Sequence, residues 1–236
     1  IDNNVLIPRC ETELIIEQVL EKFPDKNQKI SILDLGTGSG AIALALASNY
    51  LNANISATDV SSVALEVAHI NICDLFMEKS KQGDFKLYQG SWYQALSSGE
   101  FIGQISKLDK KNKKNQISKL GKISKLDDLG LNKFDVICSN PPYIDPKDSA
   151  ICESVRKHEP AGALFSQKSG LDDLEQVIEG AKDFLKPGGW VFVEHGYQQG
   201  EDVRNLFKQA GFVRVYTVND LSGHPRVSGA ILSVSI

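Results

Sequence analysis

Apolar and polar positions follow one another in blocks along the chain, and these blocks predict strands and helices in alternation. Short apolar runs rich in β-branched residues indicate buried strands, and longer amphipathic or alanine- and leucine-rich stretches indicate helices. The predicted strands cover residues 29–34, 54–58, 85–88, 134–139, 190–194, 212–218 and 229–236. The predicted helices cover residues 40–49, 61–76, 171–185 and 200–210.

This order predicts an α/β fold with a seven-stranded, mostly parallel sheet and helices on both of its faces. The last two strands have no helix between them, so we expect an antiparallel strand at one edge of the sheet. Lys186-Pro-Gly-Gly189 is expected to act as a sharp stop before the strand that begins at Trp190. We expect residues 1–236 to form one domain.

Residues 104–128 interrupt this pattern. They contain eight lysines and three aspartates, lack aromatic residues, and include three copies of Ile-Ser-Lys-Leu. Such a composition cannot bury a core, so we expect a flexible surface insertion. A basic arm that contacts RNA or the ribosome is the alternative, but a tolerated insertion is favoured because long loops cost little closure entropy.

A glycine-rich turn, Asp34-Leu-Gly-Thr-Gly-Ser-Gly40, lies between the first predicted strand and the helix after it. Glycines allow such a turn to bend sharply and to approach a ligand closely. Asp59 ends the second strand, where a carboxylate can accept both hydroxyls of a ribose, and Trp92 follows the third strand, where an indole can cover an adenine. A plain tight turn, a dinucleotide site and a core role for Trp92 are the alternatives.

Asn140-Pro-Pro-Tyr143 follows the apolar run 134–139. Two prolines cannot continue a sheet, because each lacks the N–H that the ladder requires, so a rigid turn follows the strand. In open α/β sheets, ligands bind at this carboxyl end of the strands. The Asn140 amide and the Tyr143 ring can together hold a planar group that carries an amide or amino function.

Composition narrows the class of protein. The chain has 236 residues, a net charge of −4 and no apolar run of the roughly 18 residues that a membrane span needs. Its four cysteines, Cys10, Cys73, Cys138 and Cys152, show no metal-ligand spacing. We therefore expect a cytoplasmic protein without a metal, without membrane contact and without direct nucleic-acid binding, the lysine-rich insertion being the one weak exception.

Several motifs resemble those of one enzyme family. Besides the glycine turn and Asn140–Tyr143, they are Val5–Leu14 with its Pro-Arg-Cys-Glu-Thr-Glu, Val155–Pro160, Glu194–Gly196 and Gly223–Val227. The chain is similar to the peptide chain release factor glutamine N5-methyltransferases over most of its length, the lysine-rich insertion excepted. Asn-Pro-Pro-Tyr alone is shared with DNA and RNA amino-methyltransferases, but its combination with the other motifs is specific.

The resemblance implies a Rossmann-like class I methyltransferase fold. It also implies methyl transfer from S-adenosylmethionine to the side-chain amide nitrogen of the glutamine in the Gly-Gly-Gln loop of class 1 peptide chain release factors, which affects translation termination. It assigns cofactor contacts to Gly36, Thr37, Gly38, Ser39, Gly40, Asp59, Trp92 and Asn140. It assigns substrate contacts to Asn140, Pro141, Pro142 and Tyr143, with Asn140, Pro141 and Tyr143 as the catalytic residues.

The chemistry of an amide agrees with these roles. Its nitrogen is a weak nucleophile, so a catalyst gains most by binding the planar group, by aiming the lone pair at the methyl group and by excluding water. The Asn140 side-chain oxygen and the Pro141 carbonyl can accept the two amide N–H groups, and Tyr143 can stack on the amide plane. No base is needed beforehand, because the proton leaves after the nitrogen has become positive.

The chain departs from the family pattern at two positions. Cys10 replaces the usual proline near the cofactor mouth, and Ser91 replaces a frequent carboxylate, which should weaken cofactor binding by about 1–2 kcal/mol. The family's small N-terminal helical domain, which helps to dock the release factor, is expected to be absent, so substrate affinity should suffer more than cofactor binding. His158, His195 and His224 lie in motifs and are interpreted as structural or surface residues.

Three alternatives remain open. The same Asn and Tyr could hold adenine N6 or guanine N2 of a nucleic acid with the base flipped out, which predicts a basic face around the mouth. A methyltransferase of a ribosomal protein glutamine is closer to the family, although Glu11-Thr12-Glu13 and Glu194–Gly196 favour release factors. A degraded cofactor-binding module without activity would explain the insertion and Cys10, but the intact Asp59 and Asn140–Tyr143 argue against it.

Overall fold

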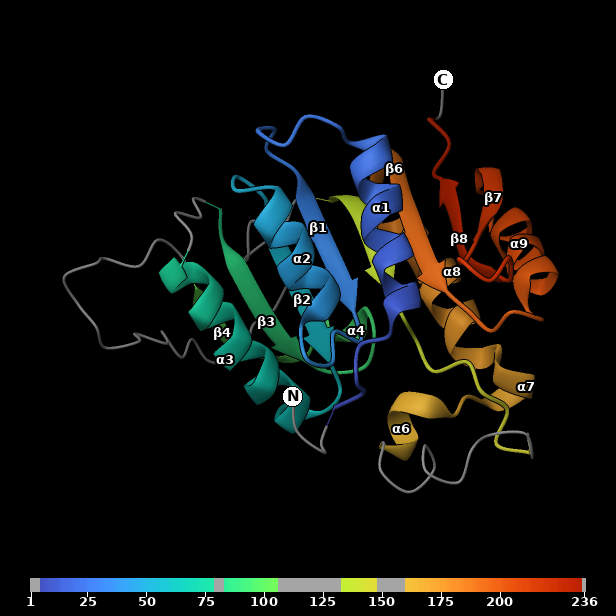
Figure 1. Ribbon diagram of the computed structural model, residues 1–236, viewed down its shortest axis with the longest axis horizontal. Helices are drawn as coiled ribbons and strands as arrows, with labels where there is room; N and C mark the ends of the chain where they lie inside the picture. Colours follow the sequence, from blue (N-terminus) through green and yellow to red (C-terminus); the bar gives the residue numbers. More distant parts are fainter. Residues whose placement is uncertain (1–4, 79–82, 106–132, 148–159, 235–236) are drawn as a thin grey trace.

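The computed structural model describes residues 5–78, 83–105, 133–147 and 160–234. They form one eight-stranded sheet in the order β4-β3-β2-β1-β5-β6-β8-β7, with helices on both faces (Figure 1). The strands are β1 Ser31–Leu35, β2 Asn54–Asp59, β3 Phe85–Gln89, β4 Glu100–Ile105, β5 Phe134–Ser139, β6 Leu185–Glu194, β7 Val213–Asn219 and β8 Pro225–Ile231. The helices are η1 Cys10–Thr12, α1 Glu13–Lys22, α2 Ala41–Asn49, α3 Ser62–Glu78, α4 Gln94–Ser97, α6 Ala161–Leu164, α7 Gln167–Gly170, α8 Asp172–Phe184 and α9 Gly200–Gln209.

The expected fold class is confirmed. Five neighbouring strands, β3, β2, β1, β5 and β6, run parallel. The last two strands pair antiparallel as expected, but β8 lies inside the sheet between β6 and the edge strand β7.

The described sheet has eight strands instead of the expected seven, because Glu100–Ile105 turns back along β3 as the antiparallel edge strand β4. The buried ring of Phe101 holds this edge strand, packing against Tyr88 with the ring centroids 5.3 Å apart. The insertion predicted at 104–128 therefore begins inside a strand, and its remainder, 106–128, lies outside the described residues.

The predicted stop at Lys186–Gly189 is wrong in one respect, because β6 already begins at Leu185. The segment forms an irregularity within the strand: Phe134 pairs with Leu185, and Val136 pairs next with Trp190. Gly188 bends the backbone there with a φ of +80° and donates its N–H to the Leu232 carbonyl at 3.0 Å. Strand hydrogen bonding thus continues past the proline and glycines.

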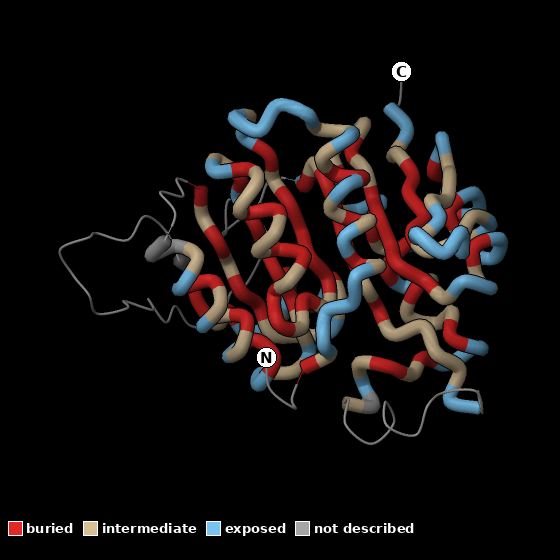
Figure 2. Tube along the Cα trace, in the orientation of Figure 1, coloured by how far each residue is buried: buried red, intermediate tan, exposed pale blue. Residues whose placement is uncertain are grey.

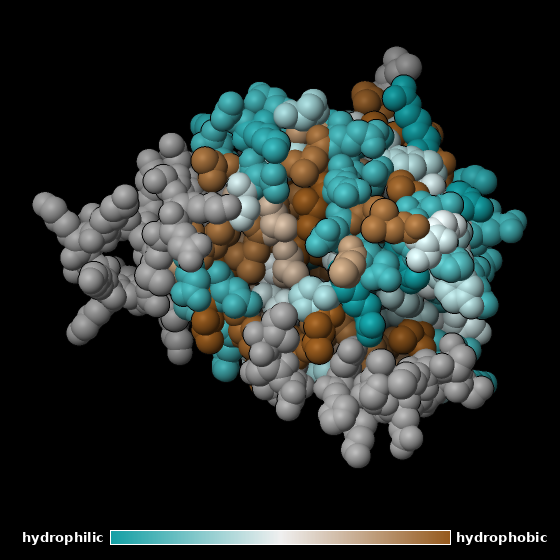
Figure 3. Space-filling view, viewed as in Figure 1, coloured by the Kyte–Doolittle hydropathy of each residue, from teal (hydrophilic) through white to brown (hydrophobic). Residues whose placement is uncertain are grey.

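The two faces of the sheet bury two clusters of apolar side chains, because successive residues of a strand point to opposite faces. Ile32 packs with α1, α2 and α3 on one face, whereas Leu33 and Leu35 pack with α8 and α9 on the other. Figure 2 shows the strands buried between the helices, and Figure 3 shows apolar side chains in the region between α1 and α2. Within the described ranges, no helix has the length and apolar character that a membrane span requires.

The order of the sheet creates a place for a ligand. The chain steps outward from β1 to β2 and β3 in one direction, and from β5 to β6 in the other. Between β1 and β5 the direction reverses, and ligands of open α/β sheets bind at the carboxyl ends of strands beside such a switch point. The glycine turn after β1 and Asn140–Tyr143 after β5 flank this point.

Candidate active site

The glycine turn has the sharp backbone that its sequence predicts. Gly36, Gly38 and Gly40 have φ values of +68°, +55° and +84°, in the left-handed region that favours glycine. The Thr37 N–H donates to the Thr58 carbonyl, and the Gly40 N–H donates to the Thr37 carbonyl, both at 2.9 Å. The turn is therefore closed on itself and anchored to β2 before α2 begins.

Asp34 holds this turn from beneath. Its buried carboxylate accepts the Thr37 hydroxyl at 2.6 Å and the Ala43 N–H at 3.2 Å, both on Oδ2. Burial raises the pKa of Asp34 to about 6, and these hydrogen bonds partly oppose that rise. Asp34 thus links β1 to the start of α2 and shapes the turn.

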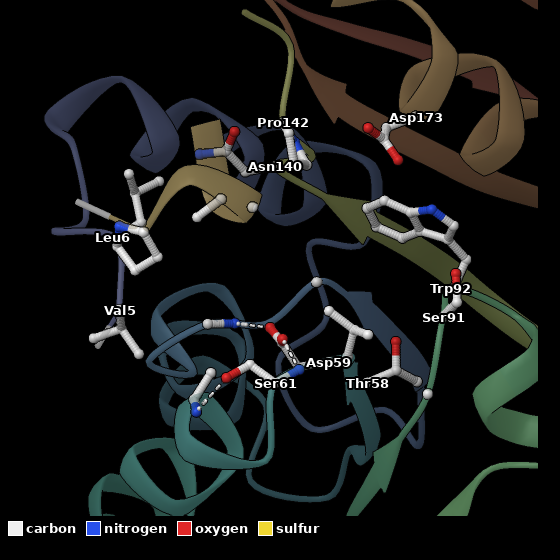
Figure 4. A pocket seen from close by; sticks show the side chains of 18 residues that line it. Val5, Leu6, Thr58, Asp59, Ser61, Ser91, Trp92, Asn140, Pro142 and Asp173 are labelled. Carbon is white, nitrogen blue, oxygen red and sulfur yellow. Dashed lines mark hydrogen bonds between the residues drawn. The ribbon is translucent and has the colours of Figure 1, made fainter. Parts of the chain in front are cut away.

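Asp59 faces the turn from the end of β2. Its Oδ2 accepts the Gly38 N–H and its Oδ1 accepts the Ser61 N–H, each at 2.9 Å (Figure 4). Burial raises the pKa of Asp59, and the backbone hydrogen bonds lower it. Each carboxylate oxygen keeps a further lone pair, so the group can still accept two hydroxyl donors.

Trp92 closes the opposite side of the same space. A Cβ built on Gly36 would lie 3.2 Å from Trp92 Cζ3, so the indole lies directly against the glycine turn. The residue is half-buried, has a φ of +41°, and turns its ring toward the cavity in Figure 4. Trp92 also packs on the core cluster of α8, so its core and ligand roles coexist.

These groups line a first cavity of about 300 Å³. The predicted site residues that line it are Gly36, Gly38, Asp59, Trp92, Asn140 and Pro142. Thr37, Ser39 and Gly40 are buried in the turn and do not line the cavity. They support its wall, since Ser39 accepts the Asn71 side-chain N–H through its carbonyl at 2.9 Å.

Asn140 projects from the end of β5, where the Ser139 hydroxyl ties the strand to the Leu35 carbonyl at 2.8 Å. Its Nδ2 donates to Thr12 Oγ1 at 3.2 Å. Its Oδ1 accepts no hydrogen bond within the part of the chain that the structure describes. The Asn140 side chain therefore presents a free acceptor.

A second cavity of about 260 Å³ adjoins the first. Pro141 and Tyr143 line it, and Leu6, Asn140 and Ala163 line both cavities. Asn140 therefore lies in the wall between the two spaces. Cys10 is exposed, and its neighbours Arg9 and Glu11 line the second cavity, so this departure from the family pattern lies beside the second cavity.

Sequence reasoning missed two residues that hold Asn140 and Tyr143 in place. Thr12, at the end of η1, donates its hydroxyl to Glu194 Oε2 at 2.7 Å. Tyr143 donates its hydroxyl to Glu194 Oε1 at 3.1 Å. Thr12 and Glu194 both lie in motifs of the family, Glu11-Thr12-Glu13 and Glu194–Gly196. The motifs therefore indicated that these residues matter, but not what they contact.

Asp173 and Arg226 were also missed. Asp173, near the start of α8, lines the first cavity beside Trp92 (Figure 4) and lies outside the motifs. Arg226 lines the second cavity and lies in the quoted Gly223–Val227. It donates to Asp220 Oδ2 and to the His195 carbonyl, both at 3.4 Å.

The histidines take the structural or surface positions that were expected, as far as they are described. His195 is fully buried, with Nδ1 2.9 Å from the Gly196 carbonyl and Nε2 2.8 Å from Ser228 Oγ. Burial lowers its pKa to about 4, so the ring is neutral at pH 7. His224 is exposed in the β7–β8 turn, and His158 lies outside the described residues.

A cavity built in this way, at the switch point of a largely parallel sheet with an antiparallel β8, places the chain among the Rossmann-like class I methyltransferases. Solved structures agree on the fold. A methyltransferase from Pyrococcus furiosus is 18% identical, with a TM-score of 0.55 over 94% of this chain and 83% of its own. A release factor-specific protein-(glutamine-N5) methyltransferase from Alicyclobacillus acidocaldarius is 22% identical, with a TM-score of 0.50 over 97% of this chain and 95% of its own.

Sequence comparison narrows the class. The family described as "Methyltransferase small domain" matches residues 12–102. Release factor glutamine methyltransferases from Francisella tularensis and Salmonella typhimurium are each 36% identical to the chain, over 98% and 94% of its length. The chain spans 68% and 66% of those two relatives. The chain belongs to the release factor glutamine methyltransferase family.

Proposed function

We propose that the chain transfers a methyl group from S-adenosylmethionine to the side-chain amide nitrogen of a glutamine, the one in the Gly-Gly-Gln loop of a class 1 peptide chain release factor. The observation that carries this proposal is the position of Asn140, whose side chain lies in the wall shared by two adjoining cavities. A transfer reaction requires the methyl donor and the acceptor to meet, and they can meet where two binding cavities adjoin. The names of the relatives from Francisella tularensis and Salmonella typhimurium support the choice of the release factor as substrate.

The first cavity suits an adenosyl group. A carboxylate with spare lone pairs at Asp59 and an indole at Trp92 match a ribose and a flat base. When bound, S-adenosylmethionine supplies an electrophilic methyl group on a positively charged sulfur. The cavity contributes binding and orientation, which suffices for an already activated methyl group.

The second cavity suits the glutamine. Asn140 Oδ1 and the Pro141 carbonyl accept the two amide N–H groups, and the Tyr143 ring, fixed through its hydroxyl, covers the amide plane. These contacts would aim the amide lone pair at the methyl group that bound S-adenosylmethionine would supply, with its sulfur as the leaving group. The nitrogen releases its extra proton to water afterwards, so the chain needs no general base.

The charges that line the cavities favour a protein substrate over a nucleic acid. Four acidic and two basic side chains line them, namely Asp59, Asp173, Glu11, Glu194, Arg9 and Arg226. A nucleic acid amino-methyltransferase requires positively charged side chains along the path of the nucleic acid, because contacts to the phosphates supply most of the binding. The described walls do not supply such a path.

Transfer of labelled methyl groups tests the proposal. Labelled S-adenosylmethionine is supplied with the chain and a release factor, its Gln→Ala variant, total ribosomal protein, or RNA and DNA. We expect label on the wild-type factor alone. Label on RNA or DNA would reject the proposal, label on ribosomal protein would move the substrate to a sister class, and cofactor binding without any label would indicate a non-catalytic module.

Asn140→Ala provides the residue-level test. We expect it to abolish transfer while changing the dissociation constant for S-adenosylmethionine by less than about threefold, because Asn140 lines only one side of the first cavity. Glu179→Gln, an exposed change on α8, is the control. Unchanged turnover in Asn140→Ala would remove Asn140 from the mechanism.

A further inference from the structure

We propose that Thr12 and Glu194 act together as positioning residues that fix which end of the Asn140 amide faces the substrate. The inference rests on the proposed function, since it concerns the acceptor that grips the glutamine. Thr12 Oγ1 stands between Asn140 Nδ2, at 3.2 Å, and Glu194 Oε2, at 2.7 Å. Thr12 belongs to η1, Glu194 to β6, and Asn140 directly follows β5, and the structure joins the three side chains into one hydrogen-bonded relay.

The direction of this relay follows from counting donors. A threonine hydroxyl carries one hydrogen and a carboxylate carries none, so Thr12 must donate to Glu194. Its remaining lone pairs can only accept, and the Asn140 group that faces them must be the donor, Nδ2. The opposite end of the amide, Oδ1, is then turned toward the cavities as an acceptor, which is the end that a substrate N–H requires.

The carboxylate has no freedom to reverse this order. Its other oxygen, Oε1, accepts the Tyr143 hydroxyl at 3.1 Å, so both oxygens are engaged by hydroxyl donors. Glu194 is fully buried and Thr12 is 7% exposed, so bulk water does not compete for these bonds. Glu194 is also held by the backbone, because it pairs with Val227 of β8 and is followed by the buried His195. One carboxylate thereby orients both the amide and the ring of Asn140–Tyr143.

An amide in place of the carboxylate would no longer fix the direction of the relay. A glutamine at 194 has a donor and an acceptor, so either group can face Thr12, and in one of the two orientations its oxygen accepts from Tyr143 while its amino group donates to Thr12. Thr12 would then donate to Asn140 and hold Oδ1, which would turn the Asn140 amino group toward the substrate. The Asn140 amino group would then face the amide N–H of the substrate glutamine, and the substrate N–H would have no acceptor.

The charged state of Glu194 depends on its neighbours. Burial raises its pKa, whereas the hydroxyls of Thr12 and Tyr143 and the positive charge of Arg226 lower it, and the negative charge of Glu11 raises it. The positive charge of Arg9 lowers the pKa of Tyr143, the hydroxyl of which donates to Glu194. A carboxyl group whose folded pKa is raised loses its charge sooner as the pH falls, so the relay adds a loss of turnover on the acid side.

Matched variants test the relay in the full chain, with wild-type labelling of the release factor established first. Thr12→Val should lower kcat by about 10- to 150-fold, the worth of a hydrogen bond to a charged group, and Glu194→Gln should lower it by up to as much, while the dissociation constant for S-adenosylmethionine stays within about twofold. Thr12→Ser keeps the hydroxyl and should retain more than about a third of wild-type kcat. The double variant Thr12→Val with Glu194→Gln should be no worse than the poorer single variant, because both break one relay.

The outcomes separate the relay from the proposed function. If the wild-type chain labels no release factor, the proposed function fails. If the wild type is active and Thr12→Val keeps its kcat, the relay is wrong. Thr12→Val keeps the shape of threonine but removes its hydroxyl, whereas Thr12→Ser keeps the hydroxyl. A kcat in Thr12→Val at least as high as in Thr12→Ser would therefore also overturn the relay, and this pair decides the case even if Glu194→Gln fails to fold. In Glu194→Gln the acid-side loss assigned to Glu194 should disappear, whereas Glu179→Gln should keep the wild-type pH profile.

Discussion

Replacing Asp59 with asparagine tests the first cavity with almost no change of shape. The Asp59 carboxylate offers about four lone-pair positions, and the Gly38 and Ser61 N–H groups occupy two of them at 2.9 Å each. Two ribose hydroxyls can use the others. An asparagine has only one acceptor oxygen, so at most two of these four donors keep a partner, and its amino group would face one of them.

The magnitude follows from this count. A hydrogen bond to a charged acceptor contributes about 1.5–3 kcal/mol, so losing one ribose contact should weaken binding of S-adenosylmethionine by about 10- to 150-fold. The effect on stability should be smaller. The variant leaves a Gly38 or Ser61 N–H without its acceptor, which is destabilising. It also removes a buried negative charge, the unfavourable burial of which raises the pKa of Asp59 in the wild type.

Titration calorimetry with two ligands makes the assay specific. The wild-type chain should bind S-adenosylhomocysteine more tightly than an analogue without ribose hydroxyls, and Asp59→Asn should lose most of that discrimination. Ser61→Ala, which keeps the Ser61 N–H that Asp59 accepts, is the matched control. If Asp59→Asn discriminates between the two ligands as well as the wild type does, the ribose role of Asp59 is refuted.

Three further changes test other parts of the structure. Gly36→Ala should weaken cofactor binding more than Gly38→Ala, because both positions have positive φ but only the Gly36 Cβ would press on Trp92, at 3.2 Å; equal losses in calorimetry would contradict this. Asp173→Ala should weaken cofactor binding by about 3- to 10-fold with kcat unchanged, because its carboxylate lies beside Trp92 and can accept the adenine amino group; equal affinity would exclude that contact. As the pH falls from 6.5 to 4, the free energy of unfolding of the wild type should decrease by about 3 kcal/mol more than that of His195→Gln. His195 binds a proton in the unfolded chain near pH 6.5 but in the folded chain only near pH 4, so acid favours unfolding of the wild type. A difference between the two urea midpoints that stays constant with pH would show that His195 titrates normally.

Much of the fold follows from local pattern. Apolar blocks such as 134–139 predict strands that the structure contains, because a strand buried on both faces must be apolar throughout. The strand β4 was not predicted, because its six residues include a glycine and lead into the lysine-rich segment. Its place depends on a tertiary contact, the packing of Phe101 on Tyr88, which no local pattern reveals.

The candidate site divides in the same way. Asp59 and Asn140 could be assigned because each follows a strand of a parallel sheet, whose carboxyl ends share one edge. Thr12 could not, since its partner Glu194 is 182 residues away and its partner Asn140 is 128 residues away. Such pairings depend on how η1 sits over the ends of β5 and β6, and the sequence carries no spacing rule for that.

The hydrogen bonds that Glu194 accepts also bear on which group takes the proton that the methylated amide nitrogen releases. Glu194 accepts a hydrogen bond from Tyr143 and is linked to Asn140 through Thr12, so it is the first carboxylate to consider as a general base. Both of its oxygens already accept hydroxyl hydrogens, from Thr12 and Tyr143, and these bonds stabilise the charged carboxylate and lower its pKa, which makes it a weaker base. A methylated amide nitrogen, by contrast, is positively charged and gives up its proton readily to water. The buried charge therefore acts more effectively as a fixed orienting group than as a base, which agrees with a reaction whose difficulty is the aim of a weak nucleophile and not the removal of its proton.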